Sequence, residues 1–199
     1  MIDGMQVAKG STLRATLDWL AATCGAEACD AVLARLSEDD RHLVRTATAT
    51  EEYPFGLWRR LSEATESEVG ASHPDWPERA GAHAIDSYGV QLYGGILRKS
   101  SPLEFLTQSV SLFRLYYQPG DMKVVEVEAS GETSARAVLR LIGFEHESRW
   151  FCRRQTGGLE RATTIAGGER ARVHHVRCTL DGDAFCEWEL RWERPKNAS

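Results

Sequence analysis

Near its C-terminal end the sequence reads His175-Val176-Arg177-Cys178-Thr179-Leu180-Asp181-Gly182-Asp183-Ala184-Phe185-Cys186. The Asp181-Gly182-Asp183 segment has the chemistry of a tight turn, because glycine accepts positive φ and aspartate bonds to its own backbone. Alternating residues on either side, 172–179 and 185–192, predict two strands. The stretch therefore predicts an antiparallel hairpin that carries one imidazole and two thiols.

The sequence before this hairpin predicts the rest of a sheet and a layer of helices. Residues 123–142 alternate between apolar and polar and predict a second hairpin. A helix is predicted for residues 150–166, between the two hairpins. Apolar residues between 13 and 115 recur at helical spacing and predict five or six helices. The order predicts an α+β fold, in which an N-terminal helical bundle is followed by ββαββ with an antiparallel sheet.

The length of 199 residues fits one domain, since domains of this size bury most of the surface of the unfolded chain. We expect a single domain over 1–199. It divides into a helical part, 1–120, a ββαββ part, 121–194, and a C-terminal tail, 195–199.

Composition excludes several classes of protein. The chain has 24 Lys and Arg against 29 Asp and Glu, a net charge of -5, which argues against a binder of the phosphate backbone of nucleic acid. No apolar stretch approaches the roughly 18 residues of a membrane span, and the first residues do not resemble a signal peptide. We therefore expect a cytoplasmic protein. Five cysteines, an odd number, do not indicate a disulfide framework.

Three cysteines fall in the last fifty residues, and they raise the question of a metal site. If the turn lies at residues 181–183, Cys178 and Cys186 approach each other across the hairpin, as tetrahedral zinc coordination requires, and Cys152 could add a ligand. The alternative, that buried cysteines act as small hydrophobic residues, stays open. Strand alternation places His174, not His175, on the face of Cys178, so His175 is a ligand only if the strand starts late or bulges.

Two short segments resemble known families. Cys178-x-x-x-Gly182-x-x-x-Cys186-Glu187-Trp188, together with the order of elements, resembles the 4-vinyl-reductase-type domain of the TRAPP-like ligand-binding folds, which are related to haem-nitric-oxide-binding proteins. A bacterial family with many paralogues in myxobacteria is similar in the break at Tyr116-Tyr117-Gln118-Pro119-Gly120 and in the final strand, Cys186 to Trp192.

The resemblance implies a set of zinc ligands. Carried over by position from the phenol-sensing members, the ligands fall on Cys152, His175, Cys178 and Cys186, with His175 where the family has an acidic residue. It implies a structural Zn2+ with all four positions filled, and so no open position for water. Cys24 and Cys29 are expected to be core residues.

The resemblance and the helical pattern together predict a non-enzymatic small-molecule sensor or ligand-binding module. It would take a small hydrophobic or aromatic ligand in an apolar cavity, and would act through a partner protein or as a homodimer, because the sequence shows no output domain. Each candidate for the pocket could equally be ordinary core. The candidates are Trp58, His83, Tyr88, Tyr93, Phe105, Phe113 and Tyr116.

Three other functions compete with this one. A protein-interaction scaffold without a small ligand is the main alternative. A haem-based gas sensor, with His83 or His146 as axial ligand, is expected to be unlikely, because the Tyr-x-Ser-x-Arg signature of haem-nitric-oxide sensors and the haem attachment motif are absent. An enzyme is not expected: there is no dinucleotide turn, phosphate loop or nucleophile elbow, and His174 and His175 point to opposite faces of a strand.

Overall fold

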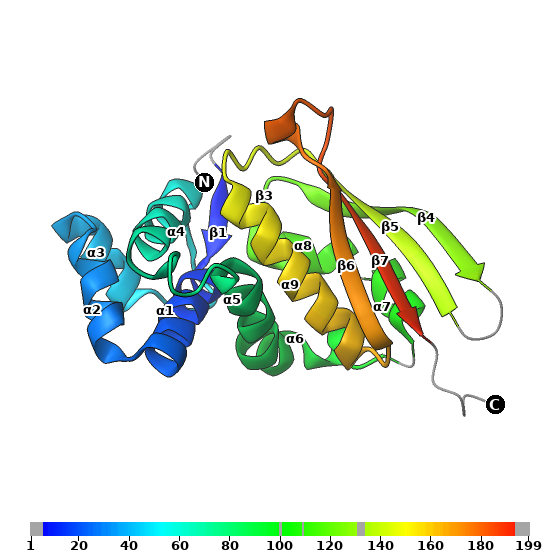
Figure 1. Cartoon of the computed structure of the whole chain (residues 1–199), viewed down its shortest axis with the longest axis horizontal. Coiled ribbons are helices and arrows are strands. Elements are labelled where there is room, and N and C mark those ends of the chain that lie inside the picture. Colours follow the sequence, from blue (N-terminus) through cyan, green and yellow to red (C-terminus); the bar gives the residue numbers. More distant parts are fainter. Residues whose placement is uncertain (1–5, 100, 109, 131–133, 194–199) are drawn as a thin grey trace.

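A computed structural model of the protein describes residues 6–99, 101–108, 110–130 and 134–193 (Figure 1). The predicted tail, 195–199, lies outside these residues. Most of the helices occupy one end of the molecule and a four-stranded sheet the other, with one long helix between them (Figure 1).

Two of the helices in the helical part have ends with recognisable capping chemistry. Ser37 precedes one helix, and its Oγ accepts a hydrogen bond of 3.1 Å from the backbone N–H of Asp40. Gly25 follows the first helix and has a φ of 90°. Glycine is common directly after a helix because it adopts positive φ without steric cost. The helices are α1 (Gly10–Cys24), α2 (Ala26–Ala34), α3 (Glu38–Thr46), α4 (Phe55–Val69), α5 (Trp76–Ala84), the π-helical turn η1 (Ile85–Gly89), α6 (Val90–Leu97), α7 (Pro102–Gln108) and α8 (Val110–Tyr116).

A small antiparallel sheet lies within this helical part and differs from the prediction. It consists of β1 (Val7–Lys9), β2 (Glu52–Pro54) and β3 (Tyr117–Gln118), in the order β2-β1-β3. The prediction of helices alone up to residue 120 is wrong here. Strands of two or three residues are too short to show a period of two, so the sequence carries no signal for them.

The main sheet follows the predicted order of elements. Its strands are β4 (Asp121–Ser130), β5 (Ser134–Ile142), β6 (Glu169–Arg177) and β7 (Glu187–Glu193), and they pair antiparallel in the order β4-β5-β7-β6. The predicted fold class, α+β with an antiparallel sheet after the helices, is confirmed.

Helix α9 (Arg149–Ile165) lies between this sheet and the N-terminal helices, where it contacts α5 on one side and β6 and β7 on the other (Figure 1). The sheet face toward α9 is apolar: Trp188, Leu190 and Trp192 alternate along β7 and are at most 4% exposed. Strand alternation sends the residues between them to the opposite face, where Glu189 pairs with Arg136.

Glycines allow α5 and α9 to touch. A Cβ atom added at Gly157 would lie 1.9 Å from the carbonyl oxygen of Glu78, and one added at Gly81 would lie 2.1 Å from that of Arg154. Any side chain at either position would overlap the backbone of the other helix. The interhelical distance is therefore set by these two glycines.

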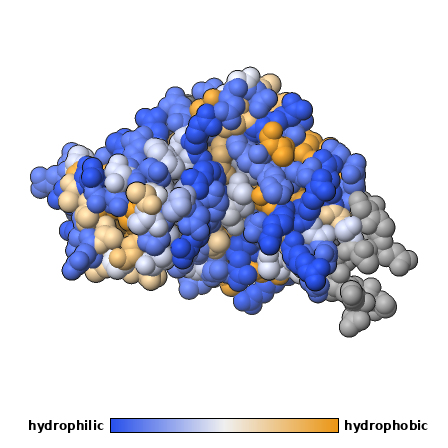
Figure 2. Space-filling view, viewed as in Figure 1, coloured by the Kyte–Doolittle hydropathy of each residue, from blue (hydrophilic) through white to orange (hydrophobic). Residues whose placement is uncertain are grey.

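The surface is largely polar. On the face shown in Figure 2, hydrophobic side chains appear as small groups separated by hydrophilic ones, a distribution common on folded domains. In the part of the chain that the structure describes, none of the helices is both long enough and apolar enough to cross a bilayer.

Candidate metal centre and internal cavity

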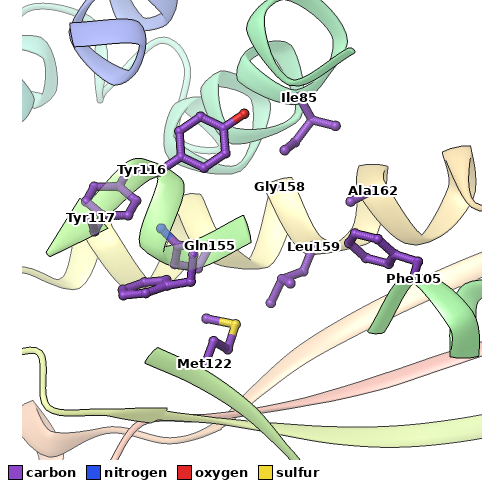
Figure 3. Close-up of a pocket in the computed structure, with 10 residues that line it drawn as sticks. Ile85, Phe105, Tyr116, Tyr117, Met122, Gln155, Gly158, Leu159 and Ala162 are labelled. Carbon is purple, nitrogen blue, oxygen red and sulfur yellow. The ribbon is translucent and has the colours of Figure 1, made fainter. Parts of the chain in front are cut away.

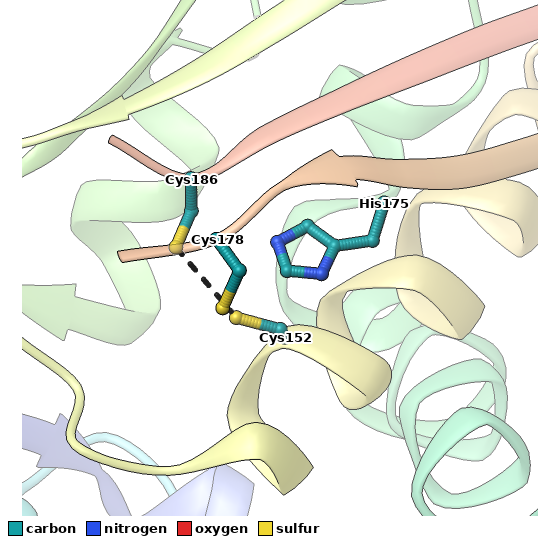
Figure 4. A group of neighbouring side chains, drawn as sticks. All are labelled: Cys152, His175, Cys178 and Cys186. Carbon is teal, nitrogen blue, oxygen red and sulfur yellow. Dashed lines mark hydrogen bonds between the residues drawn. The ribbon is translucent and has the colours of Figure 1, made fainter. Parts of the chain in front are cut away.

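The four predicted metal ligands lie together in space (Figure 4). Cys152 is in the first turn of α9, His175 is near the end of β6, and Cys178 and Cys186 flank the connection between β6 and β7. One ligand atom from each lies within 4.8 Å of the other three. All three cysteines are buried, at 1–4% exposure, and His175 is half-buried.

A bulge in β6 resolves which histidine faces the cysteines. The pairing of β6 with β7 shifts register between His175, opposite Trp188, and Arg177, opposite Glu187. This is the irregularity that a ligand role for His175 requires. His175 turns inward and stacks on Trp188 at 4.7 Å, and its buried Nε2 has no hydrogen-bond partner among the described residues. His174 is exposed.

The connection between β6 and β7 places the two flanking cysteines. It is a short 3-10 turn, η2 (Thr179–Asp181), followed by Gly182 with φ of 93°, rather than a two-residue hairpin turn. Asp183 holds it closed, because its Oδ2 accepts a hydrogen bond of 2.8 Å from the backbone N–H of Cys178. The predicted turn at residues 181–183 is present, although it is part of a longer connection. Strand β7 starts two residues later than predicted.

The separation between the sulfurs matches tetrahedral zinc. With Zn–S bonds of about 2.3 Å, two sulfurs of a tetrahedral site lie about 3.8 Å apart. The Sγ atoms of Cys152 and Cys186 are 3.8 Å apart. Three thiolates and one imidazole form a complete structural set, which leaves no position for an activated water.

The thiols share protons unequally. Cys186 Sγ accepts a hydrogen bond from the Cys152 thiol and one of 3.4 Å from the backbone N–H of Thr179. The bond from Cys152 lowers the pKa of Cys186 well below its ordinary value, and the same contact, with burial, raises the pKa of Cys152. Burial raises the pKa of Cys178. Of the three thiols, Cys186 is therefore the one whose thiolate these contacts favour most, and binding of a cation by all three sulfurs requires the remaining thiols to lose their protons.

His146 belongs to the surroundings of this cluster, and the sequence reasoning missed it there. It is 1% exposed, and its Nε2 lies 3.1 Å from Cys186 Sγ and 3.3 Å from Cys152 Sγ. It also stacks on Phe151 at 4.9 Å. His146 sits in an irregular loop with no periodicity, so no pattern predicted this position. Groups of this kind orient metal ligands and tune their basicity.

The remaining cysteines lie apart from the cluster. Cys24 ends α1 and Cys29 is in α2, and both are half-buried against the hydrophobic core. Burial raises the pKa of each thiol.

A small cavity lies between α9, α8 and β4 (Figure 3). It has a volume of about 60 Å³, and a neighbouring cavity of about 50 Å³ shares part of its wall. The first is almost wholly apolar. It is lined by Ile85, Phe105, Phe113, Tyr116, Tyr117, Met122, Gln155, Gly158, Leu159 and Ala162.

One polar group in this wall is unsatisfied. Tyr116 is buried, and its hydroxyl has no hydrogen-bond partner among the described residues. Figure 3 shows the ring of Tyr116 directed away from Met122 and toward the helix that carries Ile85. Burial raises the pKa of Tyr116 well above its ordinary value. The wall of the cavity therefore includes a phenol that stays neutral at ordinary pH and whose hydroxyl lacks a partner among the described residues.

The predicted pocket residues divide into two groups. Phe105, Phe113 and Tyr116 line the cavity. The others do not line it: Trp58 is core and stacks on Phe55 at 5.2 Å, and Tyr93 packs edge-on against Tyr116 at 5.4 Å.

Tyr88 and His83 also lie away from the cavity. The Tyr88 hydroxyl donates a hydrogen bond of 2.6 Å to Asp18 and accepts one of 3.1 Å from Arg14. His83 is half-buried near the end of α5, where its carbonyl oxygen accepts a bond from Ser87. The spacing of aromatic residues in the sequence therefore identified three residues that line the cavity, but it could not distinguish them from aromatic residues of the hydrophobic core.

No protein-family model matches the chain, and no curated protein matches it in sequence. Solved structures do match in fold, and several of them are H-NOX proteins. The H-NOX protein from K. algicida, in its unliganded Fe(II) form, is similar with a TM-score of 0.65 and 14% identity over 96% of this chain and 99% of that chain. The H-NOX protein from S. oneidensis in the Fe(II)NO state gives 0.69 and 13% over 94% and 99%. A triple variant of the S. oneidensis protein gives 0.72 and 14% over 96% and 99%.

The chain therefore has the fold of H-NOX proteins. The expected relationship to haem-nitric-oxide-binding proteins is supported at the level of fold, while the resemblance to the 4-vinyl-reductase-type domain and to the myxobacterial family stays a prediction. Two further similar structures come from work on heme distortion in the H-NOX family and on heme redox potential, with TM-scores of 0.64 and 0.62.

The expectation that haem is unlikely is wrong in the light of these comparisons, because the similar structures are haem proteins. That expectation was based on short sequence motifs, whereas the similarity in fold covers nearly the whole chain. The two internal cavities do not fit a porphyrin in this conformation. No histidine is among their lining residues, and each is far smaller than the roughly 300–1,000 Å³ of ordinary ligand sites.

His146, one of the two axial ligands considered from sequence, is held in the cysteine cluster instead. His83, the other, lies outside the cavity walls that the structure describes.

Proposed function

We propose that this protein is a non-enzymatic, ligand-sensing regulatory module built on the H-NOX fold, with a structural zinc ion at Cys152, His175, Cys178 and Cys186. The observation that carries the proposal is the cavity at the junction of α8, α9 and β4, with an unsatisfied phenol in its wall. Similarity to H-NOX structures over 94–96% of the chain supports the same class.

The position of the cavity suits a sensor. Helix α9 forms one wall and also contacts both α5 and the main sheet. A guest that fills the cavity favours one packing of α9 over others, and so shifts the population of conformations that a partner meets. The partner is a second protein or another copy of this chain.

The proposed zinc ion has a mechanical role in this arrangement. Cys152 fixes the first turn of α9, and the other three ligands fix the connection between β6 and β7. Metal binding then contributes directly to the free energy of folding. It holds one end of α9 to the sheet while the rest of the helix responds to the cavity.

The metal proposal is tested by elemental mass spectrometry of the purified protein. We expect about one zinc per chain, and a lower melting temperature after removal of the metal with a chelator. If the protein is produced in a medium that contains zinc and the purified protein still holds no metal, the site is overturned.

The sensing proposal is tested by native mass spectrometry of the protein as isolated, followed by a melting screen with small molecules. A retained small molecule, or a saturable rise in melting temperature, is the expected result. A protein that retains nothing and responds to none of the compounds, but co-purifies with a stable protein partner, would instead support the scaffold hypothesis.

A haem-based gas sensor is the second candidate, and the similarity to H-NOX structures favours it. The test is titration of the purified protein with hemin, followed by its absorption spectrum. A saturable band at one hemin per chain that is lost in Tyr116→Phe or His83→Ala, and kept in the exposed control His42→Ala, would establish it. A spectrum unchanged from free hemin would exclude it.

A further inference from the structure

Arg154 is a buried positive charge in α9. It is 3% exposed. Its Nη1 donates a hydrogen bond of 2.9 Å to Thr16 Oγ1, and its Nη2 donates one of 3.1 Å to the carbonyl oxygen of Thr12. Among the described residues, no carboxylate forms an ion pair with it. The neighbouring Arg153, in contrast, is partly exposed and pairs with Glu78 at 2.6 Å.

Such a charge is costly to leave uncompensated. A buried ion without a partner of opposite charge is strongly unfavourable, and a guanidinium does not lose its proton in proteins. Burial lowers the pKa of Arg154, while the nearby Tyr117 and Tyr116 oppose this effect. Two neutral acceptors from α1 and the hydroxyl of Tyr117 bind some of the five guanidinium protons, but none of these partners carries a negative charge.

Arg154 lines the second cavity, of about 50 Å³. The wall of this cavity also includes Thr12 and Tyr116, whose buried hydroxyl lacks a partner among the described residues. The residue with the buried positive charge and the residue with the unsatisfied hydroxyl therefore line the same cavity. Both are polar groups that a carboxylate satisfies: its oxygens accept hydrogen bonds from the guanidinium and from the phenol.

The second cavity adjoins the apolar one. The walls of the two cavities have five residues in common, which are Ile85, Tyr116, Tyr117, Gln155 and Gly158. Beyond this shared wall the apolar cavity is lined by Phe105, Met122 and Leu159. Together, the two cavities have a charged end at Arg154 and an apolar end at Phe105, Met122 and Leu159.

We propose that these cavities bind a short aliphatic carboxylate, with its carboxylate on Arg154 and Tyr116 and its alkyl chain among Phe105, Met122 and Leu159. Each cavity has room for about four water-sized groups, taking about 10–15 Å³ for each. An acid of three to six carbons fits that space. The inference rests on the proposed sensing function and names the chemical class of its ligand.

The test uses the full chain, metal-loaded, with sodium butyrate as the probe. Butyramide, which has the same shape without the charge, is the matched control, and sodium chloride at the same ionic strength controls for salt. We expect butyrate to raise the melting temperature saturably, with a binding isotherm of one per chain by calorimetry. Butyramide and chloride should do neither.

Two variants separate binding from stability. Arg154→Gln should abolish the butyrate response, and Arg153→Gln, its exposed neighbour, should leave it intact. Because Arg154 also bonds to α1, its loss can weaken the fold, so Tyr116→Phe is the second variant. It removes a hydroxyl that has no partner within the described residues, and should weaken butyrate binding by about 2–10-fold without lowering the melting temperature of the free protein.

Each outcome has a meaning for one of the two proposals. Equal responses to butyrate and butyramide would overturn the carboxylate inference but support a ligand cavity. No response to butyrate would overturn the inference, and the native mass spectrum of the isolated protein then decides the sensing function separately. A response that persists in Tyr116→Phe and Arg154→Gln would place the binding elsewhere and overturn the inference as well.

Discussion

The Sγ atoms of Cys152 and Cys186 lie 3.8 Å apart although 34 positions separate them in the chain. Cys152 belongs to α9 and Cys186 directly precedes β7. The zinc ion that we propose for this cluster would join the helix that walls the cavity to the centre of the sheet. Part of the stability of the C-terminal region would then depend on the metal.

Replacement of one ligand should remove both the metal and part of the stability. We expect Cys186→Ser to lose the bound zinc and to lower the free energy of unfolding by several kcal/mol. Urea unfolding and elemental mass spectrometry measure the two effects. Cys29→Ser, outside the cluster, should keep the zinc; equal stability and equal metal content in both variants would contradict the site.

The two adjacent histidines should behave differently. His175→Ala removes a proposed ligand and should lower zinc affinity by more than about 100-fold, since even an outer partner of a ligand contributes about 10–100-fold. His174→Ala, on the exposed face of the sheet, should leave affinity unchanged. Competition with a chromogenic zinc chelator measures both. A loss of affinity in His174→Ala alone would show that the bulge in β6 is misplaced.

The contact between α5 and α9 predicts opposite effects for neighbouring glycines. Gly157→Ala should lower stability by about 1–3 kcal/mol, because its Cβ would overlap Glu78 and the helices must separate. Gly158→Ala should instead raise stability. Its Cβ would meet nothing closer than 3.6 Å, and alanine favours a helix over glycine by about 1 kcal/mol. Thermal unfolding of the pair checks the helix contact, and a stable Gly157→Ala would refute it.

Burial of Tyr116 predicts a loss of stability in alkali. Its pKa is raised in the folded protein, while the unfolded chain ionises near the ordinary value of about 10. As pH rises above about 10, the unfolded chain releases a proton that the folded chain keeps, so stability falls. Tyr116→Phe should lose less stability between pH 8 and pH 11 in urea unfolding. An unchanged pH dependence would mean that the hydroxyl is not buried.

Much of the fold could be predicted from periodicity alone. The change from a helical period to a period of two near residue 120 indicated the α+β order, because each long element repeats its pattern several times. The three short strands gave no such signal. The three cysteines were visible as a spacing, and the resemblance to a known domain gave His175 as the fourth ligand, although strand alternation by itself favoured His174.

Haem illustrates a different limit. Its expected absence was based on short motifs, whereas the similarity to H-NOX structures lies in the packing of nearly the whole chain at 13–15% identity. At that identity the arrangement of helices and strands is retained while local motifs are not. The residues indicated the relationship to haem-nitric-oxide-binding folds, but the absence of the short motifs led to the wrong expectation about haem, which the comparison of the folded chain corrected.

The amino-acid sequence by itself determined the order of helices and strands, the turn between β6 and β7, and the types of side chain available to a metal. These depend on neighbours close along the chain. Tertiary structure decided which histidine joins the cysteines, that His146 lies beside them, and that Arg154 and Tyr116 line one cavity. Each of those facts depends on a bulge, a loop or a helix contact, which bring together residues far apart in sequence and leave no periodic trace in it.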